Sequence, residues 1–232
     1  MNNSPIIDTL LFDLDGTFID TAPDMASALN VLIAEYSGEA LPFAKIRPYV
    51  SNGSAPLITL AFGDKLTKDE AEKRRLRFID IYQENLVEQS CLFHKMEELI
   101  ENLQQQKLQW GIVTNKPAFL TEPLLQQLGL AEQAACIVSG DSTPYRKPHP
   151  EPMFHACRLA KTQPENCIYV GDDRRDITAG NAANMITLAA LYGYITSDDD
   201  PLDWNADGVI SSPGDIIDWI NNNNIQLRAA TC

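Results

Sequence analysis

The segment Thr9-Leu10-Leu11-Phe12-Asp13-Leu14-Asp15-Gly16-Thr17 joins a short apolar run to two closely spaced acids and a glycine. The run over Thr9-Phe12 predicts a buried β-strand that ends where the acids begin. Because side chains alternate along an extended backbone, Asp13 and Asp15 face the same side, about 6 to 7 Å apart along the chain. Two acids at a buried strand end are costly without a metal or a chemical role. The alternative reading is an ordinary Asp-Gly turn.

Further short apolar runs predict the other strands of the same sheet. They are Gln109-Val113, Ala135-Ser139, Cys167-Val170, Thr187-Leu191 and Asp207-Ile210. From about residue 92 onward these runs alternate with helix-like stretches, which predicts an α/β fold with a Rossmann-like, doubly wound parallel sheet. Ligands bind beyond the carboxyl ends of such strands, and the polar clusters of this chain follow those ends.

Residues 19–90 interrupt the alternation of strands and helices. Ala22-Tyr36 and Lys68-Val87 carry apolar residues at helical spacing, with no strand of comparable quality between them. We interpret residues 19–90 as an inserted helical cap domain and residues 1–18 with 91–220 as the core. The polar tail, residues 221–232, is predicted to be frayed.

Composition and charge exclude several classes of protein. A formal net charge of −14 disfavours nucleic acid and anionic membranes as partners, because the overall field repels polyphosphates. The five cysteines are widely spaced and contain no C-x-x-C pair, which fits neither a disulfide framework nor a zinc site. Neither an export signal nor a membrane-length apolar stretch is visible. We therefore expect a cytoplasmic protein, and the sequence gives no indication of its oligomeric state.

The acid pair after the first strand suits a division of labour in phosphate transfer. Asp13 is the candidate nucleophile that attacks phosphorus, and Asp15 is the candidate acid that protonates the departing oxygen. Gly16 lets the chain turn away without a side chain blocking the site. Thr17 is expected to hydrogen-bond near the acid and orient it.

The strand over Gln109-Val113 is followed by Thr114 and Asn115, which offer a hydroxyl, an amide and backbone N–H groups to a phosphoryl oxygen. A Thr-Asn pair in this place is also a common helix cap, which is the alternative reading. In the proline-rich loop Arg146-Pro152, Lys147 is the candidate cation that neutralises charge around Asp13 and the phosphate. The alternative is an exposed turn with solvated cations.

The strand over Cys167-Val170 leads into Gly171-Asp172-Asp173-Arg174-Arg175-Asp176. Mg²⁺ prefers oxygen ligands, so Asp13, Asp172 and the backbone carbonyl of Asp15 form a suitable metal site. Asp176, one helical turn after Asp172, is expected to hold Lys147 or a metal-bound water. Asp173 is a supporting candidate that serves equally well as a helix N-cap.

These four segments, in this order, closely resemble the four motifs of the haloacid dehalogenase superfamily. Asp13 and Asp15 match the first motif, Thr114 the second, Lys147 the third, and Asp172 with Asp176 the fourth. The resemblance covers the core and implies a Mg²⁺-dependent phosphatase that acts on a small phosphorylated metabolite through an aspartyl-phosphate. A phosphosugar mutase of the β-phosphoglucomutase type and a catalytically silent binding module on the same fold are the alternatives.

The helical insertion makes the chain similar to phosphoglycolate phosphatases, as do Val113-Thr114-Asn115-Lys116-Pro117 and Lys147-Pro148-His149-Pro150. N-acetylmuramic acid 6-phosphate phosphatases are a closer likeness. That likeness rests on Thr21-Ala22-Pro23-Asp24, Trp110-Gly111, Gly171-Asp172-Asp173 and Tyr192-Gly193-Tyr194-Ile195. The chain departs from its relatives at Phe18, where leucine is common, and at Asn184, where glycine is usual. Asparagine tolerates left-handed backbone angles, so the second change is compatible with a turn.

The cap is expected to supply the contacts that choose the substrate. Arg47 and the loop Ser51, Asn52 and Gly53 combine an anion-binding side chain with backbone access made possible by glycine. An arginine before an ordinary interhelical turn would look the same.

Overall fold

The computed structural model describes residues 5–228. Its centre is a parallel sheet of six strands in the order β6-β5-β2-β7-β8-β9. The strands are β2 (Thr9–Phe12), β5 (Gln109–Val113), β6 (Cys136–Val138), β7 (Cys167–Gly171), β8 (Ile186–Ala190) and β9 (Gly208–Ile210). Each of the strands predicted from the apolar runs is present, and the predicted α/β class and doubly wound parallel sheet are confirmed.

The order of the strands places the polar strand ends together. Chain order runs outward from β2 through β5 to β6, and then restarts on the other side of β2 with β7. In a doubly wound sheet this reversal opens a crevice at the carboxyl ends of the two strands where it occurs. Here those strands are β2 and β7, which precede Asp13 and Asp172.

The helices of the core cover both faces of the sheet. They are α5 (Met96–Gln105), α6 (Ala118–Gln127), α7 (Glu151–Ala160), α8 (Arg174–Ala182) and α9 (Asp215–Asn222), with short 3₁₀ turns at Pro164–Asn166 and Pro201–Asp203. Alternation along β2 sends Leu10 and Phe12 into an apolar cluster with residues of α5 and α9. Leu11 points the other way, into a second cluster with residues of α7 and α8. Burial on both faces explains why these strands read as continuous apolar runs.

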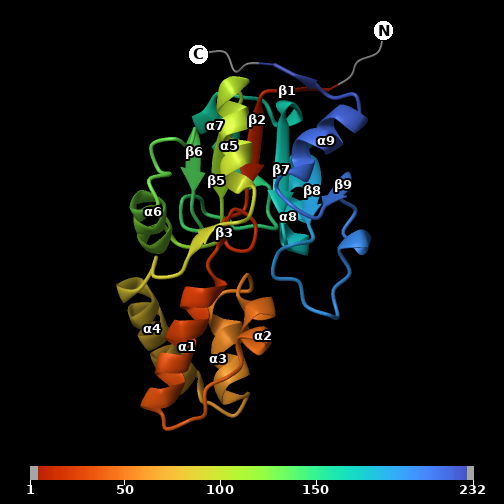
Figure 1. Ribbon diagram of the computed structural model, residues 1–232. Helices are drawn as coiled ribbons and strands as arrows, with labels where there is room; N and C mark the ends of the chain where they lie inside the picture. The colour runs from red at the N-terminus through yellow and green to blue at the C-terminus, as the bar shows by residue number, and fades with distance from the viewer. Residues whose placement is uncertain (1–4, 229–232) are drawn as a thin grey trace.

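The insertion folds as a helical cap with its own apolar core. It consists of α1 (Ala22–Glu35), α2 (Phe43–Ile46), a 3₁₀ turn (Arg47–Tyr49), α3 (Ser54–Phe62) and α4 (Lys68–Glu84). The helix α4 begins with a capping box between Thr67 and Glu70. Two antiparallel strands, β3 (Ile19–Asp20) and β4 (Cys91–Leu92), connect cap and core. Figure 1 shows the cap on the side of the sheet opposite to both chain ends, beyond the carboxyl ends of the strands.

The described part of the tail differs from the predicted frayed end. The helix α9 continues to Asn222, and β10 (Gln226–Leu227) pairs in parallel with β1 (Ile6–Ile7). Ile225 and Leu227 pack against the main apolar cluster, so two apolar residues anchor a segment whose composition is otherwise polar. Residues 229–232 of the predicted tail lie outside the described residues.

Two further expectations from composition can be compared with the described residues. Cys91, Cys136, Cys157 and Cys167 are free thiols. Among residues 5–228, no helix has the length and apolar character needed to cross a membrane.

The turn after α8 allows a test of the Asn184 substitution. Asn184 has a φ of 61°, in the left-handed region, and its side chain is exposed. We expect Asn184→Gly to leave the free energy of unfolding unchanged or slightly raised, because glycine adopts this conformation without steric cost. Asn184→Val should lower it by about 1–2 kcal/mol. Urea unfolding of the two variants measures the difference. Equal stabilities would contradict a left-handed backbone conformation at residue 184.

Candidate active site

The centre of the site is the buried ammonium group of Lys147. Its side chain has 0% exposure, and Nζ lies 2.8 Å from Asp13 Oδ1 and 2.7 Å from Asp176 Oδ1. Nζ also lies 2.8 Å from the carbonyl oxygen of Val113 and 2.8 Å from the hydroxyl of Tyr169. Four oxygens, from β5, β7, α8 and the residue that follows β2, therefore surround one cation. The structure brings together the predicted nucleophile, the predicted lysine and the predicted partner of that lysine.

This arrangement keeps Lys147 charged. Burial alone would lower the pKa of the ammonium, but Asp13 and Asp176 outweigh it and hold the pKa above its ordinary value. The hydroxyl of Tyr169 has its pKa raised by burial and by the nearby acids, so it remains a neutral hydrogen-bonding group. The site thus contains a fixed positive charge in contact with Asp13.

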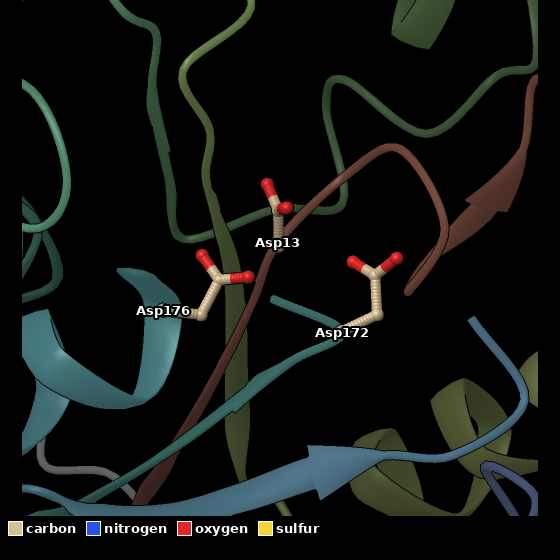
Figure 2. A group of neighbouring side chains, drawn as sticks. All are labelled: Asp13, Asp172 and Asp176. Atoms are coloured by element: carbon tan, nitrogen blue, oxygen red, sulfur yellow. The ribbon is translucent and has the colours of Figure 1, made fainter. Parts of the chain in front are cut away.

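Three acids converge beside this lysine. One carboxylate oxygen from each of Asp13, Asp172 and Asp176 lies within 4.8 Å of the others. Figure 2 shows their separate origins: Asp13 follows β2, Asp172 follows β7, and Asp176 belongs to α8. Asp13 and Asp176 each contact Lys147 through Oδ1, whereas Asp172 makes no ion pair within residues 5–228. The backbone carbonyl of Asp15 lies close to Asp172, since both accept hydrogen bonds from the hydroxyl of Ser51.

The raised pKa values in this acid cluster reflect burial and repulsion between carboxylates, which a bound cation would reduce. Burial, followed by repulsion from Asp13 and Asp176, raises the pKa of Asp172 to about 7. Burial and Asp13 likewise raise the pKa of Asp176 to about 6, against the opposing effect of Lys147. Buried carboxylates that repel one another are the oxygen donors that Mg²⁺ prefers. The residues present therefore fit the predicted magnesium site of Asp13, Asp172 and the carbonyl oxygen of Asp15.

Asp15 is oriented differently from the prediction. Its Oδ1 accepts hydrogen bonds from Thr21 Oγ1 at 2.6 Å and from Lys116 Nζ at 2.9 Å. The hydroxyl of Thr17 instead donates to Asp172 Oδ1 at 3.0 Å, so the expected contact between Thr17 and the acid was wrong. The turn at Gly16 redirects the chain between these residues, and sequence spacing cannot anticipate that change of direction.

The glycine of the first segment has a clear structural reason. Gly16 has a φ of 86°, and a β-carbon at this position would overlap the carboxylate of Asp172. The same β-carbon would lie 2.9 Å from the hydroxyl of Ser51. A side chain here would therefore separate Asp172 from Ser51 of the cap.

Thr114 and Asn115 stand at the carboxyl end of β5. Thr114 is buried, lines the cavity described below and accepts a hydrogen bond at Oγ1 from the backbone N–H of Lys116. The side chain of Asn115 makes a reciprocal pair with the backbone of Lys147, with both hydrogen bonds 3.0 Å long. Asn115 thus positions Lys147, in addition to lining the cavity. Asp173 caps α8 by accepting from the backbone N–H of Arg175.

The cap loop reaches the acids, but Arg47 does not face the cavity. Ser51, Asn52 and Gly53 line the cavity, and Ser51 Oγ lies 2.9 Å from Asp172 Oδ2. The guanidinium of Arg47 donates to the carbonyl oxygens of Tyr192 and Gly193, and it also stacks over a tyrosine ring. That placement does not support the expected substrate contact, because the donors of Arg47 hold the cap against the core.

A cavity of about 840 Å³ lies between cap and core. Asp13, Asp15 and Thr114 line its core side, and α4 contributes residues from the cap. Sequence reasoning missed several polar groups in this wall. They are Lys116, Tyr82, Arg75, Arg146 and Arg175. Lys116 could have been predicted from the sequence, since it lies two residues after Thr114. The cap residues lie on helices, and sequence spacing does not show which helical face points into the cavity.

Comparison with known proteins agrees with this geometry. Residues 10–190 match the family model described as haloacid dehalogenase-like hydrolase. The chain belongs to this family. The motif residues Asp13, Thr114, Lys147 and Asp172 fall within the matched range, and membership confirms the resemblance found in the sequence.

Relatives of this haloacid dehalogenase-like hydrolase include two differently named phosphatases. A phosphoglycolate phosphatase of Xanthomonas campestris is 41% identical over 206 residues, covering 88% of this chain and 92% of the relative. An N-acetylmuramic acid 6-phosphate phosphatase of Pseudomonas putida is 40% identical over 204 residues, with the same coverage of 88% and 92%. Together with the family match, they confirm the prediction of a phosphoric monoester hydrolase.

A solved structure supports the same conclusion on the fold. The crystal structure of a predicted phosphoglycolate phosphatase from Haemophilus somnus has a TM-score of 0.81 and 27% sequence identity. The match covers 92% of this hydrolase and 97% of that chain, so it includes the cap as well as the core.

The raised pKa of Asp172 predicts how pH and Mg²⁺ act on stability. Without metal, Asp172 in the folded protein keeps its proton up to a pH of about 7, whereas in the unfolded chain it loses the proton near its ordinary pKa of 3.8. The contribution of protonated Asp172 to the free energy of unfolding is therefore present at low pH and disappears as pH rises through about 7. Mg²⁺ requires the ionised acid. We expect Mg²⁺ to raise the melting temperature by several degrees near pH 8 and much less near pH 5.

Thermal unfolding with Mg²⁺ or with a chelator at both pH values measures this effect. Asp172→Asn should remove the shift caused by Mg²⁺, whereas the exposed Asp64→Asn should retain it. An equal shift at the two pH values would contradict the assignment of Asp172 as a metal ligand.

Proposed function

We propose that this hydrolase is a Mg²⁺-dependent phosphatase that cleaves a small phosphorylated metabolite through an aspartyl-phosphate on Asp13. The substrate is 2-phosphoglycolate or N-acetylmuramic acid 6-phosphate. The observation that carries the proposal is the buried contact of Asp13 with Lys147, 2.8 Å long, beside an acid cluster that fits a divalent cation. A carboxylate held in this way can attack phosphorus while positive charge offsets the charge of the phosphate.

The residues of the site divide the reaction into two steps. The carboxylate of Asp13 attacks phosphorus, the bond from phosphorus to the ester oxygen breaks, and Asp15 gives its proton to that departing oxygen. Asp15 then takes a proton from a water molecule that attacks the aspartyl-phosphate, which releases inorganic phosphate and restores Asp13. Lys116 and Thr21 both contact Asp15 Oδ1, which leaves Oδ2 to carry the proton.

The remaining groups bind and shield the phosphate. Thr114 and the backbone beyond β5 offer hydrogen-bond donors to phosphoryl oxygens, and Asn115 holds Lys147 in place. Bound Mg²⁺, held by Asp13, Asp172 and the carbonyl of Asp15, would neutralise phosphoryl charge. The cap closes over the cavity through Ser51 and limits access of bulk water.

The substrate class follows from the relatives and is compatible with the cavity. The two relatives at about equal identity carry different substrate names, so identity does not choose between them. A cavity of about 840 Å³ falls in the range of sites that hold drug-sized ligands, so it admits the amino sugar phosphate as well as the two-carbon acid. Assaying both compounds with Mg²⁺ and with a chelator tests the proposal directly.

Asp13→Asn is expected to abolish Mg²⁺-dependent hydrolysis of p-nitrophenyl phosphate, because an amide is too weak a nucleophile to form the covalent intermediate. We expect a loss of at least about 10³-fold in kcat. Release of p-nitrophenol measures the rate, and the exposed Asp64→Asn is the matched control. Turnover by Asp13→Asn at the native rate would exclude Asp13 as the nucleophile.

Asp15→Asn should affect substrates according to their leaving groups. An alkoxide leaves poorly and needs a proton, whereas p-nitrophenolate leaves with little help. We therefore expect kcat/KM to fall about 10²- to 10⁴-fold for 2-phosphoglycolate and considerably less for p-nitrophenyl phosphate. Comparison of the two substrates in one preparation gives the result. The same loss for both would remove Asp15 from the role of acid.

A further inference from the structure

Lys116 is a buried cation in the cavity whose purpose the phosphate chemistry does not explain. Its side chain is only 5% exposed, yet it lines the same cavity as Asp13 and Asp15. Lys147 already supplies the positive charge beside the nucleophile. A second buried ammonium is costly to desolvate, so it needs favourable partners in the bound state.

The fold fixes the position of Lys116 from both sides. Its backbone N–H donates to Thr114 Oγ1 at 3.1 Å, and its carbonyl oxygen accepts from the backbone N–H of Gly140 at 2.8 Å. Thr121 Oγ1 also donates to this carbonyl, at 3.2 Å. The segment between β5 and α6 is therefore held firmly, and the ammonium is preorganised rather than carried by a mobile loop.

The ammonium has two protein partners, one from the core and one from the cap. Nζ lies 2.9 Å from Asp15 Oδ1 and 3.0 Å from the hydroxyl of Tyr82, a residue of α4. It also lies 4.6 Å from the centre of the Tyr82 ring. A lysine ammonium has three N–H donors. Within residues 5–228, these two hydrogen bonds leave one donor for a ligand in the cavity.

The contact with Asp15 locates this donor relative to a bound substrate. The ester oxygen must come within about 2.6–3.2 Å of the carboxyl group of Asp15 to receive its proton. Since Lys116 Nζ touches the same carboxyl group, the ammonium lies beside the first atoms of the leaving group. In a leaving group of the form O–C–C, the oxygen substituents of the second carbon fall within reach of the Lys116 ammonium.

The charge and burial of Lys116 favour an anionic substituent. A hydrogen bond between two charged groups is about twice as strong as one between neutral groups, and burial strengthens it further. The other cations nearby are less suited to this part of the cavity. Arg75 is paired with Glu72, and Arg146 is exposed, with its Nε on the carbonyl of Gly140. Arg175 is paired with Asp173 and donates to the carbonyl oxygen of Ser51.

We infer that Lys116 determines the leaving-group specificity of this hydrolase by binding a carboxylate attached directly to the phosphate-bearing carbon, while the hydroxyl of Tyr82 in the cap orients the ammonium. The preferred substrates are then phosphate esters of 2-hydroxy acids, of which 2-phosphoglycolate is the smallest. A sugar 6-phosphate presents only neutral oxygens at this place. The inference rests on the proposed function, because it uses Asp15 to locate the ester oxygen.

Binding to an inactive background tests the inference without turnover. In Asp13→Asn protein with Mg²⁺, calorimetry measures the affinity for 2-phosphoglycolate and for 2-hydroxyethyl phosphate, which replaces the carboxylate by a neutral hydroxymethyl group. We expect about 10- to 100-fold tighter binding of 2-phosphoglycolate, the value of a hydrogen bond to a charged group. Adding Lys116→Met should reduce this preference to less than about threefold.

Two further variants complete the design. Lys116→Gln keeps a donor of similar length but removes the charge, so it should also lose the preference and serves if Lys116→Met does not fold. Arg146→Met removes another cation from the cavity wall and should keep the preference. A preference that survives in both Lys116 variants, or one that is absent in the Asp13→Asn protein itself, would overturn the inference.

Steady-state rates separate this inference from the proposed function. If the native protein with Mg²⁺ hydrolyses neither ester, nor N-acetylmuramic acid 6-phosphate, the proposed function fails while the binding ratio still decides on Lys116. If it hydrolyses both and the ratio of their kcat/KM values is the same with and without Lys116, the phosphatase stands and Lys116 has no role in specificity. A loss of the preference confined to the Lys116 variants supports both.

Discussion

The site depends on one buried ion pair network, in which the ammonium of Lys147 lies between Asp13 and Asp176. Removing one member of a buried network leaves an uncompensated charge, so its members must be positioned together. The amide of Asn115 holds the backbone of Lys147, and the hydroxyl of Tyr169 contacts its ammonium. These supports come from separate strands, and together they keep a nucleophilic carboxylate beside a fixed cation.

The parallel sheet makes this convergence possible. Because the chain reverses its direction of growth at β2 and β7, the segments after these strands leave the sheet at one crevice. Asp13 and Asp172 follow those strands and approach each other there. Burial, together with repulsion from the neighbouring acids, raises the pKa of Asp172 and is a consequence of this topology. The same gathering of buried oxygens favours binding of a divalent cation.

Core and cap contribute different parts of the chemistry. The core holds the groups that act on phosphorus, whereas the cap reaches them through Ser51 and Tyr82. Ser51 contacts Asp172 of the acid cluster, and Tyr82 contacts Lys116, which is paired with Asp15. The cap therefore contacts both the acid cluster and the neighbourhood of Asp15.

The sequence by itself determined the strands, the helical insertion and the main motif acids, because these signals are local: apolar runs end in polar clusters at fixed spacing. Only the tertiary structure decided which side chains meet. Thr17 contacts Asp172 rather than Asp15, Arg47 holds the cap to the core, and Lys116 joins Asp15 to Tyr82. The polar tail likewise pairs with β1. These contacts join segments far apart in the chain, and their geometry depends on turns and cap placement that residue spacing does not encode.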